Sequence, residues 1–526
     1  MKNSLLQPFY KLTARLTGQL FVALLLGAIQ VFAYAPFAQW WILYPSFIGL
    51  FLLLQRVKKS SQKTFLISFS FSLAMFIATL HWVYVSMDLF GGMPAMINML
   101  LILILCAYLA IFPTLAIWAS QRLAFLSLTQ RYLLVFPVFW LLMDGFRGWF
   151  LTGFPWAYLG YSHADTPLVG FAPLIGVQGI TLAILLICGA VTCIIQKQYI
   201  KNNVILIAII ILSGYFLQQI RYTELQPAIN VTLVQGNIDQ NEKWESSQLY
   251  PSLFKYLDLT AMNQQSDQHN ELIIWPESAV AALEIDMQDF LQPLSDKLLA
   301  QGKTLMTGII EYDVESDSYY NAIIMLGKLP TGSEYALSNA NRYRKHQLLP
   351  IGEFVPFEAL LRPLAPYFNL PMSSFQRGNE RQNNLQSGLT RLAPALCYEV
   401  AFPELLRKNI HSDTGMLLTL SNDAWFGNSI GPAQHLEIAR MRAIEFARPM
   451  LRSTNNGITA IFNDQGKELG RITTNTEGVL HKEVQPAFGF TPYQRFGSTP
   501  LHLYYMLILI GISFLSYQRI KKHHEK

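Results

Sequence analysis

Eight long apolar segments constrain this chain more than any other feature of its sequence. They lie near residues 18–34, 37–54, 65–85, 93–118, 132–150, 168–195, 204–217 and 501–517. Most are long enough to cross about 30 Å of hydrocarbon as helices, although the last two are short and only a turn at Pro36 separates the first two. Because 52% of the 526 residues are hydrophobic and 14% are charged, the chain is too apolar for a purely soluble protein. We expect a membrane protein with about eight spans.

Basic residues indicate how these segments are oriented. Lysine and arginine gather before the first segment and after the second, fourth, sixth and eighth. Loops rich in these residues remain in the cytoplasm, so both termini are expected there and the polar block before the last segment is expected outside. No clear small-residue cleavage site follows the first segment, which we expect to be retained as an anchor. The net charge of +5 comes largely from these loops and does not indicate nucleic-acid binding.

The pattern predicts three parts. Residues 1–220 form a transmembrane domain with seven spans, residues 221–499 form a polar domain, and residues 500–526 form the last span and a basic tail. Short aliphatic and β-branched runs typical of buried strands lie at 230–234, 271–275, 304–308, 322–325, 392–396, 416–420 and 457–462. A helical pattern covers 432–448. Strands that alternate with helices predict a layered α/β or α+β domain.

One cysteine, Cys397, stands apart from the other three. Cys106, Cys188 and Cys193 lie within apolar segments, whereas Cys397 lies in the polar domain and has no disulfide partner there. It follows the apolar run 392–396, at the exit of a predicted strand. A lone cysteine is most often a small buried hydrophobe, so its position alone does not make it a nucleophile.

Two other segments supply the groups that a cysteine nucleophile needs. Glu277 follows a predicted strand after Pro276, which prevents further ladder pairing. Lys345 lies in a polar turn shortly before Glu353. Each residue alone is typical of a solvated surface. Together with Cys397 they form a complete set for acyl transfer: a nucleophile, a base for its proton and a cation for the oxyanion.

These motifs resemble those of the Glu-Lys-Cys nitrilase superfamily, and the whole chain resembles its membrane-anchored branch, the bacterial apolipoprotein N-acyltransferase family. The matching stretches are Trp275-Pro-Glu277, Lys345 with Pro350-Ile-Gly-Glu353, Cys397-Tyr-Glu399, and the segments 147–156, 233–244, 421–427, 431–436 and 452–457. The chain departs from the family pattern at Gln347, Ile351 and Asp144, where the family commonly has histidine, phenylalanine and glutamate.

The resemblance implies a fold, a location and a reaction. The fold is a multi-pass α-helical membrane domain with a nitrilase-like α-β-β-α sandwich, located in the bacterial cytoplasmic (inner) membrane with the sandwich in the periplasm. In the reaction, Cys397 takes a fatty acyl chain from a phospholipid as a thioester. It then passes the chain to the free α-amine of the diacylglyceryl-cysteine that begins an apolipoprotein. The expected partners are therefore the phospholipid donor, the apolipoprotein acceptor and the lipid bilayer, and no nucleic acid.

The resemblance also assigns roles to individual residues. Glu277 is the expected base, Lys345 the oxyanion-stabilising cation and Cys397 the nucleophile. Glu353 and Glu399 are placed to hold Lys345 charged and oriented, with the satisfaction of backbone donors as the alternative role. Acyl-chain contact or gating, with core packing as the equal alternative, is expected for Trp244, Tyr398, Trp425 and Phe426.

Neither a metal nor another cofactor is expected. His435 lacks a second ligand at useful spacing, and no glycine-rich phosphate loop precedes a helix. The connection 354–375 is unusually apolar, and two interpretations are open: contact with lipid at an acyl entry, or packing on the core of the domain.

Three alternative functions are open on the sequence. A membrane-anchored amidase or lipid hydrolase would use the same residues and pass the acyl group to water. Glycosyl transfer or transport would need conspicuous charges within the spans, which are scarce. A non-catalytic lipoprotein-binding protein would not need Cys397.

Overall fold

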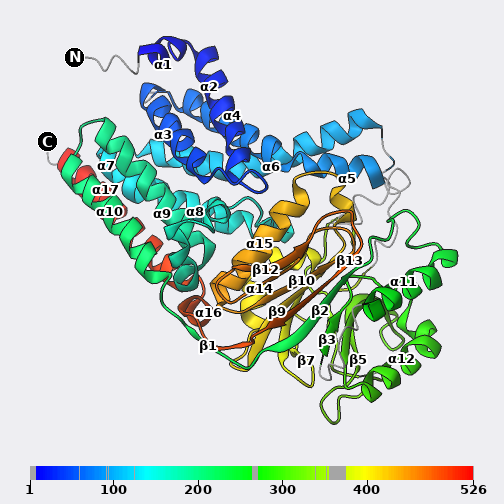
Figure 1. Cartoon of the computed structure of the whole chain (residues 1–526). Coiled ribbons are helices and arrows are strands. Elements are labelled where there is room, and N and C mark those ends of the chain that lie inside the picture. The colour runs from blue at the N-terminus through cyan, green and yellow to red at the C-terminus, as the bar shows by residue number, and fades with distance from the viewer. Residues whose placement is uncertain are drawn as a thin grey trace. The chain divides into compact units, whose positions relative to one another are not determined.

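The chain forms two compact units in the computed structural model (Figure 1). The model describes residues 7–57, 60–90, 92, 94–123, 125–262, 271–337, 339–350, 352–354 and 375–524. One unit comprises Met1–Tyr84, Met96–Ile220 and Arg495–Lys526, and the other comprises Val85–Ala95 and Arg221–Gln494. The predicted apolar connection 354–375 lies outside the described residues except at its two ends.

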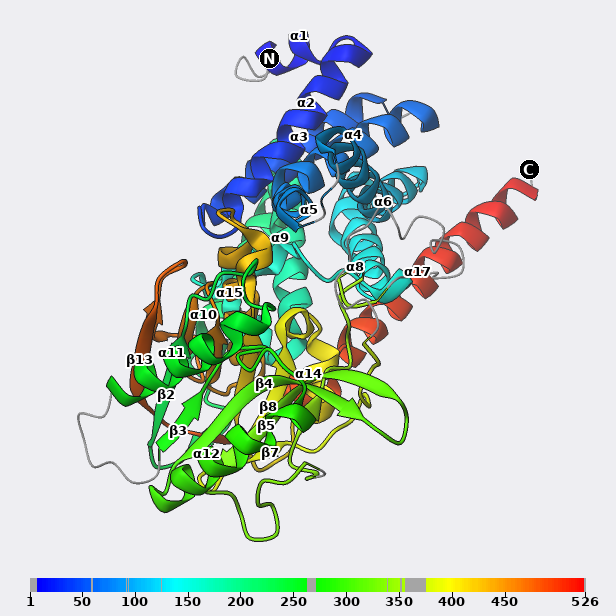
Figure 2. The same cartoon turned by 90° about the vertical axis from the view of Figure 1, so that its right-hand side faces the viewer.

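The first unit is helical, and α2 (Leu16–Ala28) packs along α4 (Ser61–Leu80) (Figures 1 and 2). Within the described part of the chain, seven helical stretches are long and apolar enough to cross a membrane. They are Leu16–Ala33, Trp40–Val57, Ser61–Leu80, Ala95–Arg122, Pro167–Ile195, Ile200–Leu217 and Thr499–Arg519. These include α6 (Ala95–Arg122), α9 (Ala172–Ile195), α10 (Ile200–Leu217) and α17 (Thr499–His524). The predicted helical membrane domain is therefore confirmed, with seven such stretches where the sequence predicts about eight spans.

The difference lies in the segment predicted as the fifth span. It is helical in three consecutive pieces: α7 (Leu128–Gln130), the π-helix η5 (Arg131–Val135) and α8 (Phe136–Arg147). These pieces adjoin without a gap, so the chain is helical from Leu128 to Arg147 with a π-helical turn inside. Arg131, Asp144 and Arg147 make this stretch more polar than the seven others.

Large aliphatic and aromatic side chains remain exposed on the outer helices. On α17, Leu507 is 65% exposed and Phe514 is 59% exposed, and on α10 Phe216 is 64% exposed. Such a surface would be unfavourable in water but suits hydrocarbon, where the helices satisfy their own backbone hydrogen bonds. The first unit therefore has the structure of a membrane-embedded domain.

The second unit contains two six-stranded sheets. The first sheet has the order β13 (Gly478–Val484), β2 (Ile229–Gln235), β3 (Glu271–Ile274), β4 (Thr304–Asp313), β5 (Ser318–Gly327) and β6 (Tyr343–Arg344). The second has the order β12 (Glu468–Ile472), β11 (Thr459–Phe462), β10 (Met450–Thr454), β9 (Thr414–Ser421), β8 (Arg391–Leu396) and β7 (Leu385–Gln386). Each sheet has three parallel strands at its centre, β2-β3-β4 and β8-β9-β10.

The two sheets face each other across a common apolar core. Leu233, Ile274 and Met306 from the first sheet and Leu396 and Leu418 from the second belong to this core and are completely buried. Central parallel strands are covered on both faces, so their sequences are continuous aliphatic runs rather than alternating ones. Because both sheets pack on this core, the carboxyl ends of their central strands belong to the same domain.

Helices cover the outer faces of both sheets (Figure 1). α11 (Leu249–Met262) contacts β2 and α12 (Gln288–Ala300) contacts β5, whereas α14 (Pro403–Asn409) contacts β8 and α15 (Gly431–Phe446) contacts β10. A separate ribbon pairs β1 (Thr223–Leu225) with β14 (Ala487–Gly489). The second unit is therefore an α-β-β-α sandwich, and the predicted fold class is confirmed.

Candidate active site

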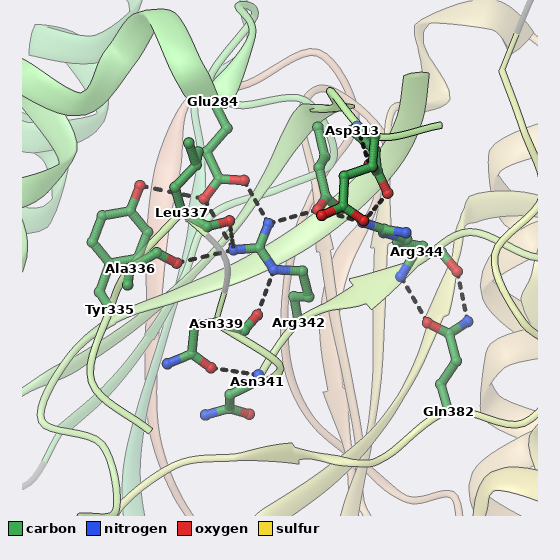
Figure 3. Close-up of polar contacts among 12 residues, drawn as sticks. Glu284, Asp313, Tyr335, Ala336, Leu337, Asn339, Asn341, Arg342, Arg344 and Gln382 are labelled. Atoms are coloured by element: carbon green, nitrogen blue, oxygen red, sulfur yellow. Dashed lines mark hydrogen bonds and ion pairs between the residues drawn. The ribbon is translucent and has the colours of Figure 1, made fainter. Parts of the chain in front are cut away.

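Lys345 directly follows β6, and a cluster of charged residues holds this strand in place (Figure 3). Arg342 donates to Glu284 and Glu311 at 2.7 and 2.9 Å, and Arg344 donates to Glu311 at 2.8 Å. Tyr343 between them belongs to the core between the sheets. Because side chains alternate along a strand, anchoring both arginines on one side directs Tyr343 and Lys345 to the other. The Lys345 N–H donates to the Asn321 carbonyl at 2.8 Å and extends the pairing with β5.

The Glu277 carboxylate is held in a tight turn after β3. Gly308 of β4 lies beneath this turn, where a Cβ atom would be 2.4 Å from the Ser278 nitrogen and 2.7 Å from the Glu277 Cα. Only glycine allows this approach. The side chain of Asn321 donates to Glu277 Oε1 at 2.9 Å, and the Asn422 N–H donates to Oε2 at 3.0 Å. Both sheets therefore position this carboxylate.

The Lys345 ammonium lies between two carboxylates. Its Nζ is 2.8 Å from Glu353 Oε1 and 3.4 Å from Glu277 Oε1, and the side chain is 2% exposed. Burial alone lowers the pKa of Lys345, but the charges of Glu353 and Glu277 outweigh it, so the pKa is raised above its usual value. Lys345 therefore remains a cation at neutral pH.

Cys397 occupies a strained turn at the end of β8. It begins the 3-10 helix η12 (Cys397–Ala401) with a φ of +51°, a left-handed conformation that residues with a Cβ rarely adopt. Burial and the charge of Glu277 raise the pKa of the thiol, and Lys345 opposes them. The thiol is therefore protonated at neutral pH and needs a base to become nucleophilic.

Glu399 binds backbone groups on both sides of the site. Its carboxylate accepts the N–H groups of Leu396 and His346 at 2.7 Å and of Gln347 at 2.8 Å. The Tyr343 hydroxyl donates to it at 2.9 Å. Burial raises the pKa of Glu399 to about 7, although the bonds from Gln347 and Leu396 lower it. Glu353 thus contacts the Lys345 ammonium, whereas Glu399 ties the segment after Lys345 to the strand that ends at Cys397.

The four aromatic residues named from the sequence have different surroundings. Trp244 is 38% exposed, and Trp425 and Phe426 are partly exposed in the 3-10 helix η13 (Asp423–Phe426). Tyr398 is buried and packs edge-on against Phe402, with ring centroids 5.1 Å apart. Three of these side chains are therefore accessible to a ligand, and the fourth is packed inside the domain.

Other polar residues at the site were not singled out from the sequence. Asn321 binds both Glu277 and Glu353, and Asn422 binds Glu277 through its backbone. The buried Lys243 donates to the Glu277 carbonyl at 3.1 Å, and burial lowers its pKa to about 8. Lys243 and Asn422 lie within segments that carry the family resemblance. In the sequence, Asn321 is a single asparagine directly before the predicted strand 322–325, and no motif marks it.

A buried Glu-Lys pair beside a partly exposed cysteine, on an α-β-β-α sandwich, is the arrangement expected of the carbon–nitrogen hydrolase class. Residues 230–489 match the family model described as "Carbon-nitrogen hydrolase", and residues 26–190 match that described as "Apolipoprotein N-acyltransferase N-terminal domain". The chain belongs to the apolipoprotein N-acyltransferase family, as its motifs predict.

Relatives in this family match almost the full length of the chain. The apolipoprotein N-acyltransferase of Vibrio vulnificus is 43% identical over 514 residues, covering 97% of this chain and 98% of that protein. That of Photobacterium profundum is 44% identical over 501 residues, covering 93% of each. The solved structure of Nit3 from Saccharomyces cerevisiae, a member of branch 10 of the nitrilase superfamily, is 18% identical with a TM-score of 0.36, covering 50% of this chain and 92% of that one.

Proposed function

We propose that this protein transfers a fatty acyl chain from a phospholipid to the free α-amine of the diacylglyceryl-cysteine at the N-terminus of an apolipoprotein. The observation that carries the proposal is the buried contact of Lys345 with Glu277 and Glu353 beside the strained Cys397, in a chain that belongs to the apolipoprotein N-acyltransferase family. The names of the relatives supply the acceptor class and the acyl transfer.

The first half-reaction acylates Cys397. The sulfur attacks the ester carbonyl of the phospholipid while the thiol proton passes to Glu277. Lys345 stabilises the negative charge that develops on the carbonyl oxygen. The tetrahedral intermediate then collapses to the thioester, and the lyso-phospholipid alkoxide leaves with the proton held by Glu277.

The second half-reaction transfers the acyl chain. The free α-amine of the lipoprotein cysteine attacks the thioester, and Glu277 accepts the proton that the nitrogen loses. Collapse of this intermediate breaks the C–S bond and forms an amide, and the thiolate recovers its proton. The reaction favours transfer because a thioester is activated toward amines and an amide is not.

Water is the competing acceptor, and the membrane-embedded unit supports transfer over hydrolysis. Hydrolysis of a soluble amide needs no spans, whereas both the donor and the acceptor of the proposed reaction are anchored in lipid. We place the reaction at the outer surface of the bacterial inner membrane, because the basic loops predict cytoplasmic termini and a sandwich outside the cytoplasm. The three accessible aromatic residues, Trp244, Trp425 and Phe426, are proposed to contact acyl chains.

The experiment that tests the proposal is acyl transfer in detergent micelles. The purified protein is incubated with a phospholipid that carries a labelled acyl chain and with a synthetic diacylglyceryl-cysteine peptide. We expect a labelled amide product from the wild type and none from Cys397→Ser. Labelled free fatty acid without the amide would instead identify a hydrolase, and neither product from folded protein would support a binding protein.

A further inference from the structure

A second polar network contacts Cys397 and has no part in the reaction as written. Its members are Ser421 at the end of β9, Asp423 in η13, His435 in α15 and Arg452 in β10. All four are 0–2% exposed. Buried charged groups are costly unless they are paired, so such a network needs a structural or functional reason.

The network reaches both the sulfur and the backbone of Cys397. The Ser421 hydroxyl is 3.3 Å from Cys397 Sγ and 2.6 Å from Asp423 Oδ1. On the other side, His435 Nε2 is 3.1 Å from the Cys397 carbonyl oxygen. Arg452 Nη2 joins the two arms, since it is 2.5 Å from Asp423 Oδ2 and 3.1 Å from His435 Nδ1. These contacts form a closed ring that runs from the Cys397 sulfur through the four residues back to the Cys397 carbonyl.

Hydrogen-bond chemistry fixes the protons in this ring. A carbonyl oxygen only accepts hydrogen bonds. His435 Nε2 therefore carries a proton, and its N–H donates to the Cys397 carbonyl oxygen. His435 Nδ1 is 3.1 Å from both Arg452 Nη2 and Asp423 Oδ1. Burial and the charge of Arg452 lower the pKa of His435, and together they outweigh Asp423, which raises it. The imidazole is therefore neutral at neutral pH, and its Nδ1 accepts from Arg452. Burial raises the pKa of Asp423, but the charge of Arg452 outweighs it, and this pKa lies well below its usual range. Asp423 is therefore an anion bonded to Arg452 and Ser421.

The backbone next to this network leaves room for the Asp423 carboxylate and holds Cys397 in a strained conformation. At Gly457, a Cβ atom would lie 2.3 Å from Asp423 Oδ2, so no other residue fits without displacing the carboxylate. The left-handed backbone of Cys397 is strained and persists only where neighbouring groups hold it. The bond from His435 is made to the carbonyl of this strained residue.

We propose that Ser421, Asp423, His435 and Arg452 form a positioning network for the nucleophile, in which His435 holds the strained Cys397 backbone and the Ser421 hydroxyl stabilises the thiolate. While the thiol is intact, the Ser421 hydroxyl donates its single proton to the Asp423 carboxylate. When Cys397 loses its proton, the hydroxyl turns to the sulfur. The inference rests on the proposed function only in taking Cys397 as the reacting group.

The first test measures the thiol without any lipid substrate. The full-length protein in detergent is treated with iodoacetamide over a range of pH, and the label on Cys397 is quantified by peptide mass spectrometry. The charged groups that act on this thiol are Glu277, Lys345 and Asp423, which remain in every variant. We expect Ser421→Ala to slow alkylation about 10-fold at pH 8 and to move the pH profile upward, because a hydrogen bond to a charged atom is lost. Ser453→Ala, which removes a buried hydroxyl outside the ring, keeps the wild-type rate.

The second test concerns the backbone arm. We expect His435→Leu to slow formation of the acyl-enzyme about 10-fold or more, whereas His435→Gln recovers most of the rate because its amide can still donate to the Cys397 carbonyl. Melting temperatures verify that each variant is folded. A wild-type alkylation profile in Ser421→Ala, or equal rates for His435→Gln and His435→Leu, would overturn the proposal. Alkylation needs no lipid. The first test therefore still decides the role of Ser421 if the protein proves not to transfer acyl chains.

Discussion

At the scale of single residues, the site depends on how its buried charges are shared. Lys345 faces the carboxylates of Glu353 and Glu277, and Asn321 donates to both of these carboxylates. Glu353 is the nearer to Lys345. In the proposed reaction, Glu353 is therefore the counter-ion of the ammonium, and Glu277 is the base.

Removal of the counter-ion charge tests this division. We expect Glu353→Gln to lower the rate of acyl-enzyme formation about 10- to 100-fold, since Glu277 then becomes the main partner of Lys345 and a weaker base. The rate is measured as labelled acyl chain on the protein with time. Glu380→Gln is the matched control, because its carboxylate is 50% exposed and pairs with Lys408 on the surface. An unchanged rate in Glu353→Gln would contradict the division of roles.

The pKa of Glu399 predicts how stability depends on pH. Burial raises this pKa from 4.5 to about 7, so the folded state holds the proton more tightly than the unfolded state. The contribution of Glu399 to stability is therefore present below about pH 4.5 and falls by up to about 3 kcal/mol as pH rises through 7. The melting temperature of the wild type is measured at pH 5 and pH 8 beside that of Glu399→Gln. We expect a smaller difference in the variant; an equal difference would show that Glu399 does not titrate in this range.

At the scale of elements, strand ends and a glycine place the site. Glu277 follows β3, Lys345 follows β6 and Cys397 follows β8, so three separate strand ends supply the groups of the proposed reaction. The charged cluster of Arg342 and Arg344 anchors β6 (Figure 3). Gly308 lets the Glu277 turn lie directly on β4.

A methyl group at Gly308 should displace the base. We expect Gly308→Ala to cost about 1–3 kcal/mol of stability and to reduce acyl-enzyme formation, because the added Cβ meets backbone atoms that cannot move aside. Melting temperature and acylation rate are measured together. Gly388→Ala is the control, since its Cβ would meet only ordinary contacts at 3.5 Å or more. Normal acylation in folded Gly308→Ala would show that this close approach is not needed.

The sequence predicts the strands that are both buried and aliphatic, and it misses strands that carry polar residues. β2, β3, β8 and β9 are buried on both faces, and their aliphatic runs indicated strands. β10 was missed because Arg452 and Thr454 interrupt its apolar pattern, and their burial depends on partners far away in the chain. β13 was missed because it is a partly exposed edge strand in which three consecutive polar residues, His481 to Glu483, interrupt the apolar pattern. Motifs named Glu277, Lys345 and Cys397, whereas Asn321 meets them only through sheet pairing that no local pattern records.

At the scale of the whole molecule, the apolar helical unit suits the proposed chemistry because the proposed substrates are lipids. Both proposed substrates carry acyl chains, so an enzyme anchored in the bilayer meets them at high local concentration and without extraction into water. The orientation follows from charge: basic loops and the basic tail predict cytoplasmic termini. The sandwich would then act on lipoproteins after their export.

Labelling in spheroplasts tests this orientation. Single cysteines are introduced at Glu315, which is exposed on the sandwich, or at Lys201, which is exposed in the first turn of α10. We expect a membrane-impermeant maleimide to label Glu315→Cys in intact spheroplasts, and Lys201→Cys only after permeabilisation. The reverse pattern would contradict the predicted topology.

The most direct measurement is the intact mass of the purified protein after incubation with phospholipid alone. The account predicts that the wild type gains the mass of one fatty acyl chain, that hydroxylamine removes it, and that Cys397→Ser does not gain it. A folded wild-type protein that gains no acyl mass from any of several phospholipids would contradict the thioester intermediate, as would an adduct that persists in Cys397→Ser.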